Sequence, residues 1–291
     1  MKRLLLALVL TTSACSSAIS GTATPLTGNL AVVNAPGTAT ALAAVKTAAE
    51  AVFSYDSANP AAFDQAVAAN VTGAAKAQLT ALFEQVKKSP QPVRLTTTVA
   101  RAAALELSGG KVRELAVLEQ VSGTTKGLAT VAFTALEESG RWRLSDIAVN
   151  PAQPSPAPHP VDGSLPGLRD SALAGARGAA GALFTTDSGD PEGSYTRAEA
   201  VAAEPLLSDY RAKKATYVDA IRRSGTKVAL GPDPVAGVTV LTGGRATVLF
   251  FTTLKVTAAT GTTDRPFTTE LDLVREGPTW KATAVRPITA A

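Results

Sequence analysis

Apolar residues recur along the chain with two different periods, and the change of period separates expected helices from expected strands. Residues 40–56 are rich in alanine and place apolar side chains three or four positions apart, which predicts a helix. Similar stripes over residues 71–86 and 206–221 predict longer helices. Asn59-Pro60 and Asp190-Pro191 fit an N-cap followed by proline at the first helical position.

After the expected helices, apolar residues recur at every second position, which is the period of strands. Leu271 and Leu273 alternate with Glu270 and Asp272, as in a sheet with one solvent-exposed face. Two Gly-Gly pairs, 109–110 and 243–244, predict tight hairpin turns. The expected strands are 93–107, 111–121, 127–137 and 141–149, then 226–231, 235–242, 245–259, 266–275 and 279–286. Helices followed by antiparallel strands predict an α+β fold.

These elements come in two sets because the chain contains an internal repeat. Residues 48–60 match residues 179–191 at seven of thirteen positions without a gap. Further matches follow in the same order: 86–89 with 221–224, 107–111 with 241–245, and Trp142 with Trp280. The spacing between partners drifts from 131 to 138 residues, as expected if insertions fall in loops. Between the copies, the proline-rich residues 150–166 predict a stiff, extended linker.

The N-terminus predicts export. Lys2 and Arg3 precede an apolar run, Leu4 to Leu10, that is too short to cross a bilayer. Thr12-Ser13-Ala14-Cys15 resembles the lipobox of bacterial lipoproteins, which implies that Cys15 is acylated and becomes the new N-terminus. The alternative is an ordinary secretory signal with an incidental cysteine. We expect residues 1–14 to be a lipoprotein signal peptide and 15–38 a lipidated N-terminus and flexible tether, with the protein anchored at the outer face of the cell membrane.

Composition limits the kinds of binding site and cross-link that the chain can form. The chain has 291 residues, of which 45% are hydrophobic and 18% charged, so it can form a sizeable core. Loss of Lys2 and Arg3 would lower the net charge from +4 to +2, too little to indicate nucleic-acid binding. One cysteine and one histidine exclude an internal disulfide and cysteine-based or multi-histidine metal sites. His159 lies among the linker prolines and is expected to be solvated, so we expect no cofactor and no metal.

The element order and the closing Gly140-Arg141-Trp142-Arg143-Leu144 are similar to the nuclear transport factor 2-like (SnoaL-like, cystatin-like) fold, in which a curved sheet wraps a long helix into a cone. Residues 53–60, 74–90 and 136–149 also resemble Mce-associated (mammalian-cell-entry associated) proteins. The resemblance implies two tandem cone domains, residues 39–150 and 168–291, joined by a linker over 151–167.

Several repeated charged residues have structural interpretations. Asp56 and Asp187 are expected in the turn that ends the first helix of each copy, where local hydrogen bonding is favoured over catalysis. The basic pairs 87–88 and 222–223 are expected to close helices, where cations suit the negative dipole end. We also expect the two copies to pack on each other as a pseudo-dimer.

An enzyme is the first of three functions that remain open. Some members of the resembled superfamily, such as ketosteroid isomerases and polyketide cyclases, place an aspartate or a histidine in the cone as general base. The acids on the expected strands alternate with apolar residues, which predicts solvent exposure, so no catalytic residue is assigned. They are Glu106, Glu114, Glu119 and Asp272.

The other two functions depend on binding. An apolar small molecule or lipid could occupy the cone, lined by Val248, Phe250, Thr252, Leu254 and Val256, although these residues would equally serve to pack the long helix. The third function is non-catalytic assembly with an envelope protein, and the family resemblance implies support of a Mce-type lipid transport complex. We expect the third function, with a carrier or sensor of apolar ligands as the alternative.

Overall fold

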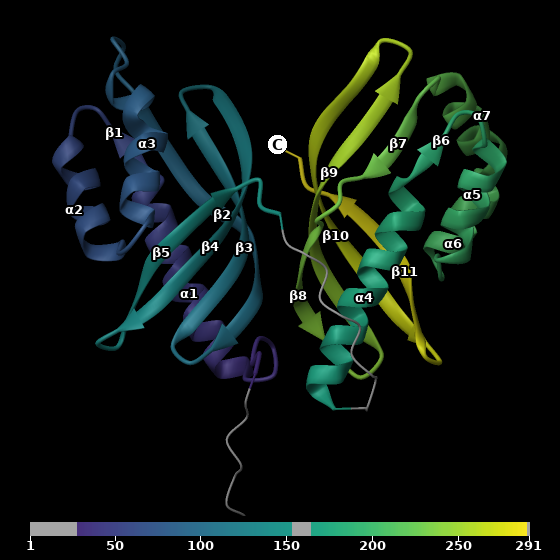
Figure 1. Ribbon diagram of the computed structural model, residues 1–291, viewed down its shortest axis with the longest axis horizontal. Helices are drawn as coiled ribbons and strands as arrows, with labels where there is room; N and C mark the ends of the chain where they lie inside the picture. The colour runs from purple at the N-terminus through teal and green to yellow at the C-terminus, as the bar shows by residue number, and fades with distance from the viewer. Residues whose placement is uncertain (1–27, 153–163, 290–291) are drawn as a thin grey trace, which may run out of the picture.

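The computed structural model describes residues 28–152 and 164–289, which form two halves that each combine helices with an antiparallel sheet (Figure 1). Helices in the first half are α1 (Ala35–Val52), α2 (Pro60–Asn70) and α3 (Ala75–Lys87). Its strands are β1 (Tyr55–Asp56), β2 (Arg94–Ser108), β3 (Lys111–Ser122), β4 (Thr125–Glu138) and β5 (Arg141–Val149). The four long strands agree with the sequence prediction within a few residues.

The second half repeats this order. Its helices are α4 (Leu165–Phe184), α5 (Pro191–Ala200), α6 (Leu206–Ala212) and α7 (Lys214–Ser224). Its strands are β6 (Thr186–Asp187), β7 (Lys227–Leu230), β8 (Val235–Leu241), β9 (Arg245–Ala258), β10 (Gly261–Glu276) and β11 (Thr279–Pro287). β7 and β8 correspond to the single strand β2, and Pro232 and Pro234 lie at the break because proline cannot donate to a ladder. The fold is α+β, as the sequence predicts.

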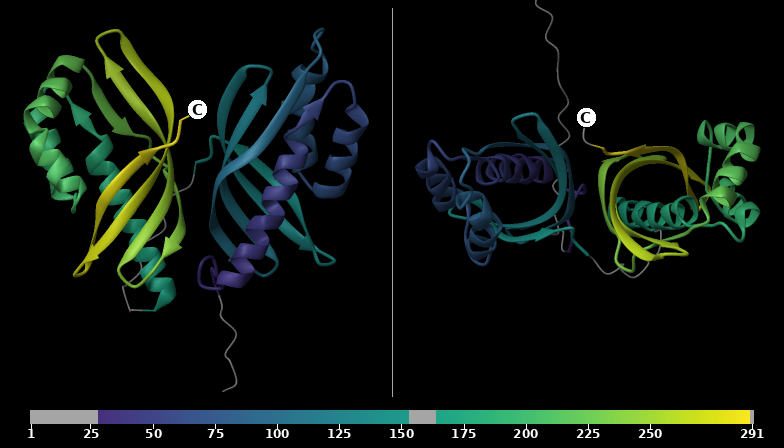
Figure 2. Two further views of the ribbon diagram at one scale, coloured as in Figure 1. Left: turned by 180° about the vertical axis from the view of Figure 1, so that it is seen from behind. Right: turned by 90° about the horizontal axis from the view of Figure 1, so that it is seen from above.

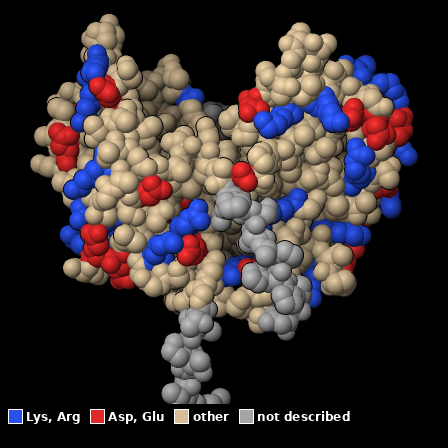
Figure 3. All heavy atoms as spheres, in the orientation of Figure 1, with Lys and Arg blue, Asp and Glu red and all other residues tan. Residues whose placement is uncertain are grey.

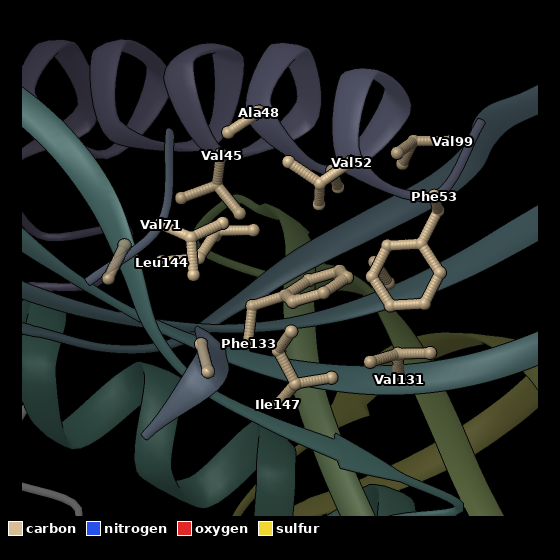
Figure 4. Packing of buried hydrophobic residues seen from close by; sticks show 14 of the residues in the cluster. Val45, Ala48, Val52, Phe53, Val71, Val99, Val131, Phe133, Leu144 and Ile147 are labelled. Atoms are coloured by element: carbon tan, nitrogen blue, oxygen red, sulfur yellow. The ribbon is translucent and has the colours of Figure 1, made fainter. Parts of the chain in front are cut away.

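The sheet of each half curves around its first helix, α1 or α4, as the view from above shows (Figure 2). In the first half, Val45, Ala48 and Val52 of α1 point toward Phe133 and other apolar residues of the sheet (Figure 4). In the second half, α4 packs its alanine face on β8, β9, β10 and β11. Small residues on α1 and α4 let each sheet approach its helix closely. Each half has its own hydrophobic core between the helix and the sheet.

Several boundaries differ from the sequence prediction. Residues 29–38 belong to the fold and not to a tether, because Ala31 is buried and Asn34 caps α1. α4 begins at Leu165, capped by Ser164, so the last three residues of the expected linker are helical. Val71 pairs with Leu144 as a β-bridge and does not start a helix. Finally, the stripe 206–221 is broken at Lys213 into α6 and α7.

The two halves pair through equivalent residues. β2 and β8 are joined by one antiparallel bridge, Ala104 to Val238, and these residues are 134 apart, the spacing at which Leu107 repeats as Leu241. The Thr130 and Thr268 hydroxyls lie 2.6 Å apart, with the 138-residue spacing that relates Trp142 to Trp280. Contact of a position with its own repeat is the mark of a two-fold, self-complementary interface. The expected packing of the two copies is therefore observed.

Apolar side chains on the outer faces of the two sheets fill this interface. They form a cluster separate from the two helix-facing cores: Ala103, Leu105, Leu115, Val117, Val235, Leu249 and Phe251. At the closest approach, a Cβ on Gly237 would lie 2.7 Å from the Cβ of Ala103, its repeat equivalent. The absence of a side chain at Gly237 therefore lets the two strands meet.

Two polar contacts add asymmetry to the interface. Arg101 of β2 forms a 3.3 Å ion pair with Glu270 of β10, and this glutamate also contacts Arg286. The guanidinium of Arg169, which is 5% exposed on α4, donates to the backbone oxygens of Asn29 and Ala31. The segment before α1 therefore bridges both halves, since Leu30 also donates to the carbonyl of Leu107 on β2.

Substitution of Gly237 by valine should separate the two strands at their closest contact. Overpacking at such a site costs about 1–3 kcal/mol, so the free energy of urea unfolding should fall by that amount. Gly127→Val is the matched control, because Gly127 also lies in a strand and a Cβ there meets nothing within 4 Å. Equal effects of the two substitutions would contradict the close contact.

Candidate functional site

The repeated aspartates Asp56 and Asp187 hold a turn in each half. A carboxylate oxygen of Asp56 accepts from the backbone N–H of Ala58 at 2.8 Å, and Asp187 accepts from Gly189 at 2.9 Å. Each also pairs across the short ladder with a base, Arg94 or Lys227. The backbone hydrogen bond and the lysine keep the pKa of Asp187 below its usual value. The expected local role is confirmed, although both residues lie in short strands rather than in a turn that directly ends the helix.

A groove recurs at the same place in both halves, beside the two tryptophans. In each half it lies between the first helix, the end of the second helix and the last β-hairpin, and its volume is about 460 Å³. Residues of the first groove include Thr40, Ala44, Thr47, Asn70 and Trp142. Their repeat equivalents Ser171, Gly175, Gly178, Val201 and Trp280 line the second groove. Equivalent lining residues make the grooves two copies of one site.

The second groove is built around Trp280. Its indole N–H donates to the Ser171 hydroxyl at 3.0 Å, and a Cβ on Gly175 would lie only 2.4 Å from the Cβ of Trp280. The tryptophan therefore packs directly against the backbone of α4. Next to it, Ala174 and Gly178 leave the helix surface open, and Lys281 supplies the charged side chain of the lining. The result is a shallow apolar groove with one cation.

The first groove is more polar. Trp142 is half-buried, and Thr40 and Thr47 stand where the second groove has Ser171 and Gly178. Glu137 and Arg141 of the β4–β5 hairpin lie on its lining, whereas Pro278 and Thr279 occupy the hairpin in the other half. The two grooves therefore share a framework and differ in charge, which suits binding of related but distinct groups.

Glu114 departs from the sequence prediction most clearly. It is 0% exposed on β3, and neither of its carboxylate oxygens has a hydrogen-bond partner among the described residues. Its strand neighbours are Ala104 and Phe133, both in the core that α1 covers. Burial raises the pKa of Glu114 well above its usual value, which favours the neutral acid. The prediction of solvent exposure is wrong here because the inward face of β3 carries this acid among apolar residues.

In the second half, a valine stands at the position of Glu114. Val248 is 134 residues further along and pairs with Val238 just as Glu114 pairs with Ala104. A general base must reach its substrate, and the buried oxygens of Glu114 are closed to solvent in this state. The alternation pattern alone does not reveal that Glu114 is buried. The sequence does contain a signal, because Glu114 aligns in the repeat with the apolar residue Val248.

The remaining sequence candidates are distributed over the sheets. Glu106, Glu119 and Asp272 are half-buried, and a hydrogen bond from Arg286 keeps the pKa of Asp272 below its usual value. Val248 and Phe250 pack into the core beneath α4. Thr252 is buried, and Leu254 and Val256 are half-buried. Of the five residues expected to line a cavity, Val248 and Phe250 therefore pack against the helix instead.

Some predictions lie outside the described residues, among them the acylated Cys15 and the linker residue His159. Within residues 28–152 and 164–289, no group of three or more histidine, cysteine or acidic side chains is arranged to hold a metal ion. In the same ranges, none of the helices combines the length and apolar character needed to span a membrane.

Known protein families and curated proteins provide no match to this chain. Among solved structures, the periplasmic domain of DotI is 15% identical and covers 41% of this chain and 94% of its own length, with a TM-score of 0.34. An IcmL-like type IV secretion system protein from Legionella pneumophila is 13% identical, covering 42% and 94%, with the same score. An NTF2-like protein involved in plasmid conjugation is 12% identical, covering 87% and 97%, with a TM-score of 0.27. At these scores the similarities carry no functional inference.

Replacement of Glu114 by valine, the residue of the other half, should stabilise the protein at neutral pH. An unpaired buried polar group costs about 1–3 kcal/mol. Because the folded-state pKa is raised, the wild type keeps its stability below pH 4.5, the ordinary value, and loses it as the pH rises toward the folded pKa. The gain of Glu114→Val in the free energy of unfolding should therefore grow above pH 4.5.

Urea unfolding of both proteins at several pH values measures this gain. Glu119→Val, on the same strand but half-buried, is the control, because it also replaces a glutamate by valine and leaves the buried acid in place. A gain for Glu114→Val that stays constant between pH 4 and pH 8 would contradict the raised pKa.

Proposed function

We propose that this protein is exported, is anchored by a lipid at Cys15 and acts by binding to a partner in the cell envelope, with no catalysis of its own. The observation that carries the proposal is the duplicated groove. Two equivalent grooves of about 460 Å³ recur on one unit, and the interface between the halves leaves both open. Two linked sites bind a partner with two matching groups more tightly than either site does alone.

The grooves favour a binding role over catalysis because of what lines them. Apolar and small residues surround one tryptophan in each groove, and the charged groups are Glu137 and Arg141 in the first and Lys281 in the second. Aromatic side chains beside small residues suit recognition of a protein segment. Among the described residues, the one acid whose pKa is raised well above its usual value, Glu114, lies inside a core and away from both grooves.

The finer identity of the protein is part of the proposal. We infer that the two halves are nuclear transport factor 2-like domains, on the strength of their element order and of the sheet curved around a long first helix. The partner we propose is a subunit of an envelope transport complex, and the sequence resemblance makes a Mce-type lipid transport complex the first candidate. A carrier of apolar molecules is the alternative, because grooves of this volume also fit small ligands.

Filling the grooves should weaken partner binding without harming the fold. Thr47→Leu and Gly178→Leu each place a larger side chain in one groove, and a Cβ on Gly178 meets nothing within 4 Å. In-cell crosslinking of the double variant, followed by purification and mass spectrometry, should recover the partner several-fold less than the wild type does.

Gly181→Leu is the matched control for this experiment. Gly181 lies on the same helix, also has open space around its Cβ and does not line the groove. It should leave partner recovery unchanged. Unchanged recovery with the filled grooves would contradict the groove proposal, whereas a stoichiometric lipid without any protein would favour the carrier alternative.

Cys15→Ala tests the anchor on its own. Two acyl chains hold a protein stably on a bilayer, since each buried methylene contributes about 0.8 kcal/mol. The wild type should therefore stay on membranes that are washed with high salt, whereas the variant should be released by the wash. A variant that is processed normally and stays on salt-washed membranes would contradict acylation of Cys15.

A further inference from the structure

One end of the molecule gathers four hairpin turns and the starts of both long helices. We call it the anchor end, and it comprises the turns β2–β3, β4–β5, β8–β9 and β10–β11 with the first turns of α1 and α4 (Figures 1 and 2). Neighbouring turns are joined by hydrogen bonds, since the backbone N–H of Glu137 donates to the carbonyl of Gly110 and the backbone N–H of Arg275 to that of Gly244. The described chain also begins at this end, since the backbone N–H of Leu30 donates to the carbonyl of Leu107, next to the β2–β3 turn.

Basic residues follow each of these turns. Residues 106–113, 136–143, 241–245 and 275–281 contain seven lysines and arginines against four glutamates. Arg141 and Arg245 are exposed and form no ion pair with any described residue, whereas Lys111 and Lys281 are paired with Glu106 and Glu276. Because residues 15–291 carry a net charge of only +2, the anchor end holds the positive excess of the molecule. Figure 3 shows blue side chains, with red ones among them, along this lower edge of both halves.

Apolar side chains are exposed beside these cations. Leu136, next to the β4–β5 turn, is 37% exposed, Leu165 at the start of α4 is 42% exposed, and Val240, next to the β8–β9 turn, is 54% exposed. These are three of the five large apolar residues that are most exposed in the described chain. Exposed apolar groups combined with lysine and arginine are the composition of surfaces that rest in a membrane interface.

The length of chain before the fold limits how far the anchor end can be from the bilayer. Thirteen peptide units separate Cys15 from Gly28, and even a fully extended segment of this length spans at most about 45 Å. If Cys15 is acylated, residue 28 therefore lies within this distance of the membrane, which keeps the anchor end close to it. This step depends on the lipid anchor proposed above.

We propose that the anchor end docks on the anionic phospholipid surface of the membrane that carries the protein. Arg245 and Arg141, which also lines the first groove, contact the phosphate groups, and Leu136, Leu165 and Val240 enter the headgroup region. Docking fixes the orientation of the molecule, so that the opposite end, with the hollow between the two halves (Figure 3), faces away from the bilayer. The contact adds to the lipid anchor and does not require it.

Vesicle binding of the chain that starts at Ser16 tests the docking surface. This chain has neither leader nor acyl group and retains every described residue. It should sediment with phosphatidylcholine vesicles that contain phosphatidylglycerol, bind far less to phosphatidylcholine alone, and lose binding as salt is raised. Arg141→Ala with Arg245→Ala should lower the partition coefficient roughly ten- to thirty-fold.

Lys126→Ala with Arg265→Ala is the matched control. These exposed residues form no ion pair in the described chain and lie in the β3–β4 and β9–β10 hairpins, whose turns are at the opposite end. The control should bind like the wild type. Equal binding to both kinds of vesicle, or an equal loss with the control pair, would overturn the docking surface. Because this chain is not acylated, such a failure is independent of the Cys15→Ala result on the anchor.

Discussion

The architecture depends on one contact, at which Ala103 and Ala104 of β2 meet Gly237 and Val238 of β8. Each residue touches the position that is its own equivalent in the other half. The pair Ala103 and Gly237 requires small residues, since a Cβ added to Gly237 would lie 2.7 Å from the Cβ of Ala103. Around it, Leu115, Val117, Leu249 and Phe251 exclude water. Because the outer faces of both sheets are used here, the grooves beside the tryptophans remain as the equivalent open surfaces.

The two halves keep a common framework apart from the breaks between β7 and β8 and between α6 and α7, and they differ further in their side chains. The bulge opposite Thr134 and Ala135 recurs opposite Asp272 and Leu273, 138 residues later. Glu114 has become Val248, so only one core contains a buried acid. A duplicated unit of this kind can present one shape twice with different chemistry. This fits a protein that binds a partner with two related but unequal parts.

Much of this arrangement could be predicted from the sequence, because its strands alternate regularly and its turns contain glycine pairs. The predicted bounds of β2, β3, β5 and β9 lie within one or two residues of the observed ones. β10 begins at Gly261, five residues before its predicted start, because Thr262 to Arg265 lack an apolar alternation. The break at Lys213 was missed because the apolar stripe continues through it. Burial of Glu114 and the two grooves depend on contacts between distant segments, which periodicity does not contain.

The central claim is that the two halves form one unit with a fixed relative orientation. Pulsed electron–electron double resonance tests it most directly, with spin labels in the β3–β4 turn at Thr124 and the β9–β10 turn at Thr260, and with Cys15 replaced by serine. The contact at Gly237 predicts a single narrow distance distribution that broadens in Gly237→Val. A broad distribution in the unsubstituted protein would contradict a fixed interface and, with it, the paired presentation of the grooves.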